Sequence, residues 1–169
     1  IVKAQGSPIT AEATFNDNSK IHAASMCVQV AEVEVDPETG QVELKKFTST
    51  HNTGTVLNPL MHQGQIEGAS MTGIGYTLME EMVISDGKVA TTHFGEYKIP
   101  TIKDVPVFKG SVTEEPHGAG PYDSMPIGET GNIPTAAAIA NAVEDACGVR
   151  ITSLPITAEK IHAALHGSK

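Results

Sequence analysis

Val28-Gln-Val-Ala-Glu-Val-Glu-Val35 is the first stretch of this chain with a clear structural signal. It is followed by Asp36-Pro-Glu-Thr-Gly40 and then by Val42-Glu-Leu44. Apolar and polar residues alternate on both sides of the central segment, as in strands with one buried and one solvated face. Pro37 presets φ in that segment and Gly40 supplies a positive φ. The stretch therefore predicts a β-hairpin, to which we assign a structural role only.

A long helix is predicted downstream of the hairpin, from Pro59 to about Glu81. Asn58 can cap its N-terminus, and proline is favoured at the first helical position. The segment contains four glycines, at positions 64, 68, 73 and 75. Because each costs about 1 kcal/mol relative to alanine, four would cost roughly 3–4 kcal/mol. Two explanations stay open: tight packing against another element, or the close approach of a ligand.

The remaining elements follow from shorter signals. They are a weak strand at 11–15 with a turn at 16–18, a second hairpin at 82–92, a strand near 107–112, a helix at 136–147, a strand at 149–154 and a short helix at 158–165. Asn132 or Thr130 can cap the helix at 136–147, and Thr157 the last one. Together these elements predict an α+β fold, with a mixed β-sheet packed against one long and two shorter helices. We expect residues 1–169 to form a single domain.

Charge and cysteine usage exclude several classes of protein. The net charge is −9, from 20 acidic and 11 basic residues, and the longest basic run is Lys45-Lys46, so we expect neither nucleic acid nor a membrane as partner. Cys27 and Cys147 are too far apart in sequence for a local metal site, and the seven histidines are scattered. We therefore expect no metal bound directly by side chains, and a cytoplasmic location.

A loop rich in glycine and proline precedes the helix at 136–147. It reads Pro121-Tyr-Asp-Ser-Met-Pro-Ile-Gly-Glu-Thr-Gly-Asn-Ile-Pro134, with Gly128 and Gly131 on either side of Glu129. Glycines let such a backbone pass close to a ligand. The sequence contains no complete dinucleotide, phosphate-binding or hydrolase motif. From the residues alone, Glu129 is either a functional carboxylate or part of a packing loop.

Several of these segments resemble, in order, those of one enzyme family. Gly64-Gln-Ile-Glu-Gly-Ala-Ser-Met-Thr-Gly-Ile-Gly-Tyr-Thr-Leu-Met-Glu-Glu81 is similar to the glycine-rich helix of the molybdenum hydroxylases, the xanthine dehydrogenase and aldehyde oxidase family. The segments 30–42, 96–100 and 127–131 resemble its hairpin, its Tyr-Lys-Ile-Pro element and its catalytic loop. The resemblance implies the C-terminal part of a molybdopterin-binding subunit, as a fragment or a split subunit.

The resemblance also implies roles for individual residues. Glu129 falls on the general base of the family. Ser70, Met71, Thr72, Gly73 and Gly128 fall where the family approaches its molybdenum–molybdopterin cofactor, which would be shared with the rest of the subunit. Iron–sulfur clusters and FAD would lie on partner domains or subunits. The implied activity is hydroxylation of a small molecule, an N-heterocycle or an aldehyde, and the isolated chain would be inactive.

Three positions depart from the family pattern. Thr72 replaces a common glutamine, Met125-Pro126 replaces a frequent Lys-Gly pair, and Asn52 replaces a common aspartate. The first two affect the expected cofactor geometry and the path of the loop, and none of the three removes Glu129. The alternative is a non-catalytic structural or assembly subunit of the same kind of complex.

Overall fold

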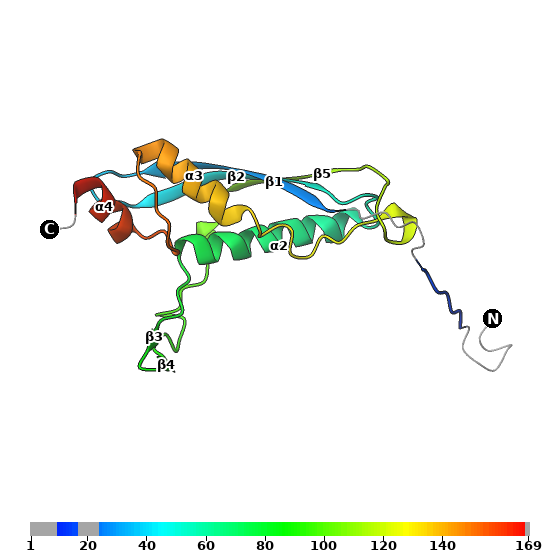
Figure 1. The fold of residues 1–169 in the computed structure, drawn as a ribbon, viewed down its shortest axis with the longest axis horizontal. Coiled ribbons are helices and arrows are strands. Elements are labelled where there is room, and N and C mark those ends of the chain that lie inside the picture. Colours follow the sequence, from blue (N-terminus) through cyan, green and yellow to red (C-terminus); the bar gives the residue numbers. More distant parts are fainter. Residues whose placement is uncertain (1–9, 17–23, 168–169) are drawn as a thin grey trace.

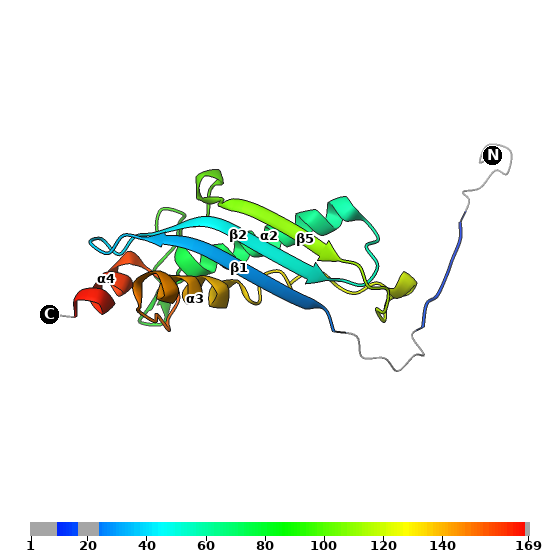
Figure 2. The same cartoon turned by 90° about the horizontal axis from the view of Figure 1, so that it is seen from above.

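The computed structural model describes residues 10–16 and 24–167. Its main sheet has the strand order β1-β2-β5, from β1 (Met26–Val35), β2 (Val42–Asn52) and β5 (Val107–Thr113). β1 and β2 are antiparallel, whereas β2 and β5 are parallel. The long helix α2 (Pro59–Leu78) and the shorter helix α3 (Thr135–Cys147) cover the same face of the sheet (Figure 1 and Figure 2). The fold is therefore α+β with a mixed sheet, as predicted.

The hairpin of β1 and β2 forms because its alternating residues separate onto two faces. Inward-facing Ala31, Val33 and Val35 pack against the core, while the residues between them are exposed. In the turn, an Asp36 carboxylate oxygen accepts from the Glu38 N–H at 2.8 Å. Gly40 has φ of 75°, and a Cβ there would collide with the carbonyl of Ala158. The turn thus requires glycine for its conformation and for its contact with the last helix.

Helix α2 begins as the sequence predicts and ends earlier. The Asn58 side chain accepts from the Met61 N–H at 3.1 Å, and Pro59 is the first helical residue. The helix stops at Leu78. The Met79 N–H still makes a helical bond to the Gly75 carbonyl at 2.9 Å, but the Glu80 N–H donates to that same carbonyl, at 2.8 Å, and so leaves the helical pattern. By the criterion of length and hydropathy, no helix of the described residues could cross a membrane.

The core lies between the sheet and the helices. Six apolar side chains form its buried centre: Phe47, Ile74, Ile139, Val143, Ile156 and Ile161. They come from β2, α2, α3, the last helix α4 (Ala158–His166) and the segment just before α4. The Thr157 hydroxyl caps α4 by accepting from the Lys160 N–H at 3.4 Å, as predicted.

Smaller elements complete the fold. β3 (Ile84–Ser85) and β4 (Lys88–Val89) form the second predicted hairpin, shorter than expected. Two 3-10 turns, η1 (Ile102–Asp104) and η2 (Pro121–Asp123), lie before and after β5.

Three local predictions are wrong. Residues 11–15 form no strand, and neither do residues 149–154. Within 149–154, Val149 and Ile151 still pack against the core, so the apolar character of this segment reflects burial and not strand pairing. The residue that caps α3 is Pro134, without a side-chain hydrogen bond, and neither Asn132 nor Thr130 caps it. The predicted turn at 16–18 lies mostly outside the described residues.

Candidate functional site

The loop that carries Glu129 lies against α2 on its way to α3 (Figure 1). At Gly131 a Cβ would come within 2.8 Å of the Ala69 Cβ, so a larger residue would push the loop away from the helix. The Tyr76 hydroxyl donates to the Asn132 carbonyl at 2.7 Å. The Asn132 N–H in turn donates to the Glu129 carbonyl at 3.1 Å. The backbone after Glu129 is therefore fixed to α2.

The backbone before Glu129 is also held. The Met125 N–H donates to the Thr53 carbonyl at 2.9 Å, and the Ser25 hydroxyl donates to the Pro126 carbonyl at 2.8 Å. Glu129 itself is exposed. No hydrogen bond or ion pair joins its carboxylate to any other described residue. An unbonded carboxylate thus stands on a loop that is anchored at both ends.

The residues of α2 predicted to approach a cofactor divide between its two sides. Ser70 is fully buried, Met71 is half-buried against the core, and a Cβ on Gly73 would lie 2.5 Å from the Thr135 side chain. Thr72 is exposed. Because Ala69, Thr72 and Tyr76 are spaced i, i+3 and i+7, Thr72 lies on the helix face that meets the loop. Of these residues, Thr72 is the exposed one, and its hydroxyl donates to the Gly68 carbonyl at 3.0 Å.

The four helix glycines have different surroundings. Gly73 packs against Thr135, and a Cβ on Gly75 would collide with the Glu80 side chain. Gly64 and Gly68 are exposed. Apart from their chain neighbours and the backbone of the helix itself, no atom lies within 4 Å of where their Cβ atoms would stand. With Thr72 they are spaced i, i+4 and i+8, so they share one side of the helix. We call Gly64, Gly68 and Thr72 the open stripe. Gly128, on the loop, is also exposed with nothing within 4 Å of its Cβ position.

A buried polar network lies on the inner face of the sheet, beneath the loop. The Gln29 amide nitrogen donates to the Gly131 carbonyl at 2.6 Å and to the Ser49 hydroxyl at 3.0 Å. The Ser49 hydroxyl is 2.7 Å from His51 Nε2, and the Cys27 thiol is 3.6 Å from the same nitrogen. The network therefore ties the loop to β1 and β2.

Burial governs the titration of this network. It lowers the pKa of His51 below its usual value. It also raises the pKa of the Cys27 thiol, although the hydrogen bond with Ser49 acts in the opposite direction. Among the described residues, His51 Nδ1 and Thr53 Oγ1 are buried without a hydrogen-bond partner. We expect His51 to be neutral in the folded chain at pH 7.

Sequence reasoning missed this network. The available signal was that the inward positions of the hairpin change from apolar to polar along the strands. On β1 they are Val35, Val33 and Ala31 at one end, and then Gln29 and Cys27. Polar residues at inward positions need partners, and these partners belong to the loop and the helices.

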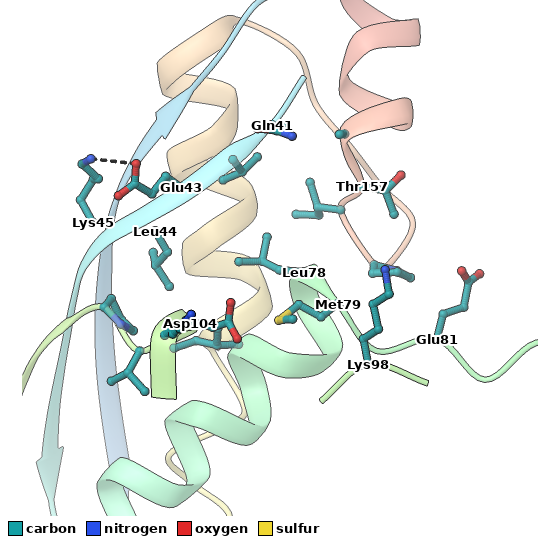
Figure 3. Close-up of a pocket in the computed structure, with 18 of the residues that line it drawn as sticks. Gln41, Glu43, Leu44, Lys45, Leu78, Met79, Glu81, Lys98, Asp104 and Thr157 are labelled. Atoms are coloured by element: carbon teal, nitrogen blue, oxygen red, sulfur yellow. Dashed lines mark ion pairs between the residues drawn. The ribbon is translucent and has the colours of Figure 1, made fainter. Parts of the chain in front are cut away.

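A groove of about 1190 Å³ lies at the other end of the molecule. Figure 3 shows Leu44 and Leu78 inside it, with the ion pair of Lys45 and Glu43, 2.9 Å apart, at its edge. None of the predicted site residues lines this groove. Within residues 10–16 and 24–167, no group of three His, Cys, Asp or Glu side chains could hold a metal ion. The candidate site is thus an open surface along α2 and the loop.

Comparisons with known proteins identify the family. Residues 1–106 match the molybdopterin cofactor-binding domain. The chain is 35% identical over 166 residues to the putative xanthine dehydrogenase molybdenum-binding subunit of Escherichia coli K12, covering 96% of the chain and 22% of that protein. It is 35% identical over 163 residues to subunit gamma of the 6-hydroxypseudooxynicotine dehydrogenase complex of Paenarthrobacter nicotinovorans, covering 94% of the chain and 20% of that protein.

A solved structure agrees with these relatives. The aldehyde oxidoreductase of Desulfovibrio gigas superposes with a TM-score of 0.77 at 33% identity, over 83% of the chain and 15% of that enzyme. The chain spans about a fifth of the length of the two relatives described above. It therefore belongs to the molybdenum hydroxylases, a family of molybdenum-dependent oxidoreductases, and matches their molybdopterin cofactor-binding domain.

Proposed function

We propose that this chain forms one wall of the active site of a molybdenum hydroxylase, with Glu129 as its general base. The observation that carries this proposal is the placement of the Glu129 carboxylate. It is exposed on a loop whose backbone is held at Met125 and at Asn132. A carboxylate with free oxygens on a fixed backbone is suited to accept a proton from a reactant.

The open stripe fits the approach of a bulky cofactor. Where Gly64 and Gly68 face outward, no side chain of the described residues fills the space beyond the backbone. Two exposed glycines within a helix weaken it by roughly 1 kcal/mol each relative to alanine, so a bound group that needs this space would account for them. Thr72 and Gly128 would contact the molybdopterin cofactor, whereas Ser70, Met71 and Gly73 would support it by fixing α2.

The chemistry divides between the cofactor and the chain. When bound, the molybdenum cofactor supplies the two-electron oxidation of the substrate, with the added oxygen coming from water. Glu129 would accept, at a carboxylate oxygen, the proton that this water-derived nucleophile loses. General-base catalysis of this kind contributes typically about 10²–10⁴-fold to the rate. The other walls of the site would come from the rest of the subunit, so the isolated chain should be inactive.

The proposed substrate is an N-heterocycle or an aldehyde. The relatives above are named for xanthine, for 6-hydroxypseudooxynicotine and for aldehydes. Electrons would leave through iron–sulfur clusters and FAD on partner domains or subunits. A single iron–sulfur cluster commonly takes four cysteines, and this chain has two.

The test uses the chain assembled with the polypeptides encoded beside it. Molybdenum content and hydroxylation of xanthine, nicotinate and benzaldehyde are measured for the wild type, Glu129→Gln and the control Glu38→Gln. Glu38 is an exposed carboxylate in the hairpin turn. We expect Glu129→Gln to keep its molybdenum and lose turnover by about 10²-fold or more, and the control to match the wild type.

Two results would contradict the proposal. If Glu129→Gln turns over at the wild-type rate with full molybdenum content, Glu129 is not the base. If no assembly of the chain contains molybdenum, the alternative of a structural subunit is favoured.

A further inference from the structure

Gln29 joins four parts of the fold through one side-chain amide. Its nitrogen donates to the carbonyl of Gly131 in the loop at 2.6 Å and to the hydroxyl of Ser49 on β2 at 3.0 Å. The same nitrogen is 3.5 Å from the hydroxyl of Ser70 on α2. Its oxygen accepts from the hydroxyl of Thr135 on α3 at 2.8 Å. Ser49, Ser70 and Thr135 are fully buried, so water does not compete for these bonds.

The orientation of the amide follows from its partners. If the amide were turned over, its oxygen would lie against the Gly131 carbonyl oxygen, and two acceptors would face each other. Thr135 is also 3.3 Å from the Gly131 carbonyl, but a hydroxyl has one proton, and the shorter contact to Gln29 uses it. Gln29 is therefore the side chain that donates to Gly131.

This donor acts close to Glu129. Gly131 lies two residues after Glu129, and the next carbonyl, that of Asn132, accepts from Tyr76 on α2. Two successive carbonyls are thus held from two different elements. Because no described residue bonds the Glu129 carboxylate, the position of that carboxylate depends on the backbone that these donors fix.

We propose that Gln29 is a positioning residue for Glu129. Its amide holds the Gly131 carbonyl against the sheet and thereby keeps the base in one place. The effect on turnover rests on the function proposed above, whereas the effect on the order of the loop does not. A misplaced catalytic group can lower the rate about 10²-fold even when its own chemistry is intact.

The test uses the assembled complex and three variants. Gln29→Met keeps the length of the side chain and removes both the donor to Gly131 and the acceptor from Thr135. Ile161→Val, in the buried core on α4, is a stability control that leaves the loop untouched, and Glu129→Gln tests the base itself. Hydrogen exchange of the amides at 127–133, molybdenum content, kcat and KM are measured for each. The substrate is whichever of xanthine, nicotinate and benzaldehyde the wild type hydroxylates.

We expect Gln29→Met to exchange the amides at 127–133 at least 10-fold faster than the wild type or Ile161→Val. Its kcat should fall by about 10- to 100-fold, with a smaller change in KM and unchanged molybdenum content. Exchange and kcat like those of Ile161→Val would overturn the proposal, and so would a molybdenum loss that matches the loss of turnover.

The two proposals can fail separately. If Glu129→Gln keeps full turnover, the base is wrong, while the exchange measurement still decides whether Gln29 orders the loop. If Gln29→Met does not assemble, Gln29→Glu is measured in the same way at pH 8. It keeps the acceptor for Thr135 and, when ionised, offers no donor to Gly131.

Discussion

Two pairs of glycines in α2 have opposite surroundings. Gly73 and Gly75 lie against other parts of the fold, where a Cβ would meet Thr135 or Glu80, whereas Gly64 and Gly68 face open space. The first pair is explained by packing within this chain. The second pair has no such explanation among the described residues, and it lies on the same side of the helix as Thr72. The contrast shows that one residue type in one helix can serve packing at one end and leave an open surface at the other.

The largest expected effect on stability comes from overpacking the end of α2 that already contacts α3. Gly73→Ala places a Cβ 2.5 Å from the side chain of Thr135, so α2 and α3 must separate. Overpacking of this kind typically costs about 1–3 kcal/mol, and urea unfolding of the chain should show such a loss. An unchanged free energy of unfolding would mean that the two helices are not in close contact at this point.

A smaller effect of opposite sign is expected at the open end. Gly68→Ala adds a methyl group where no atom outside the helix's own backbone and the neighbouring residues lies within 4 Å. Alanine is favoured over glycine in a helix by about 1 kcal/mol. The free energy of unfolding should therefore rise by up to about this amount. Gly64→Ala is the matched control and should behave in the same way. If both variants are destabilised, the stripe is not open in the folded chain.

In the assembled enzyme, Gly68→Ala should impair binding of the molybdenum cofactor. If the cofactor occupies the space beside Gly68, the added methyl group narrows that space, and Gly68→Ala should lower molybdenum content relative to the wild type. Gly148→Ala would not be a suitable control, because Gly148 has φ of 75°. Ala137→Ser, at an exposed position on α3, is better suited. If Gly68→Ala and Ala137→Ser contain equal amounts of molybdenum, the open stripe does not take part in cofactor binding.

The smallest expected effect is a pH dependence of the free energy of unfolding, caused by the buried residue His51. Burial keeps the pKa of His51 below its usual value in the folded chain. In the unfolded chain, His51 should titrate at about 6.5. As the pH falls through that value, the unfolded state takes up a proton that the folded state does not. The free energy of unfolding should therefore decrease. His51→Asn should reduce this pH dependence, and His117→Gln, at an exposed histidine, should not. Identical pH profiles for the wild type and His51→Asn would contradict the prediction.

Local signals predicted much of the fold. The hairpin, the start of α2 at Asn58 and the cap of α4 at Thr157 depend on residues close together in sequence, and they form as expected. The strand predicted at 149–154 does not form, because an apolar run alone does not supply a neighbouring strand. Burial against the core produces the same pattern.

The candidate site was harder to predict from the sequence than the fold was. The resemblance directed attention to Glu129, but the residues that hold its loop are distant in the chain: Gln29 and Gly131 are 102 positions apart. An alternating strand pattern also does not reveal what an inward polar residue will meet. For the same reason, the sequence left both explanations of the helix glycines open. Packing accounts for Gly73 and Gly75, and the approach of a cofactor is our proposal for Gly64 and Gly68.

The contact between the hairpin turn and α4 has a consequence for how the chain folds. Gly40 lies against Ala158, and the Pro37 carbonyl is 2.9 Å from His166 Nε2, so the turn receives its partners from the far end of this sequence. Contacts of such long sequence separation slow folding, because a large loop must close before they form. On the ribosome, the hairpin would emerge long before α4. The part of the turn that α4 covers would stay exposed during that interval, and this is when a chaperone would have most to bind there.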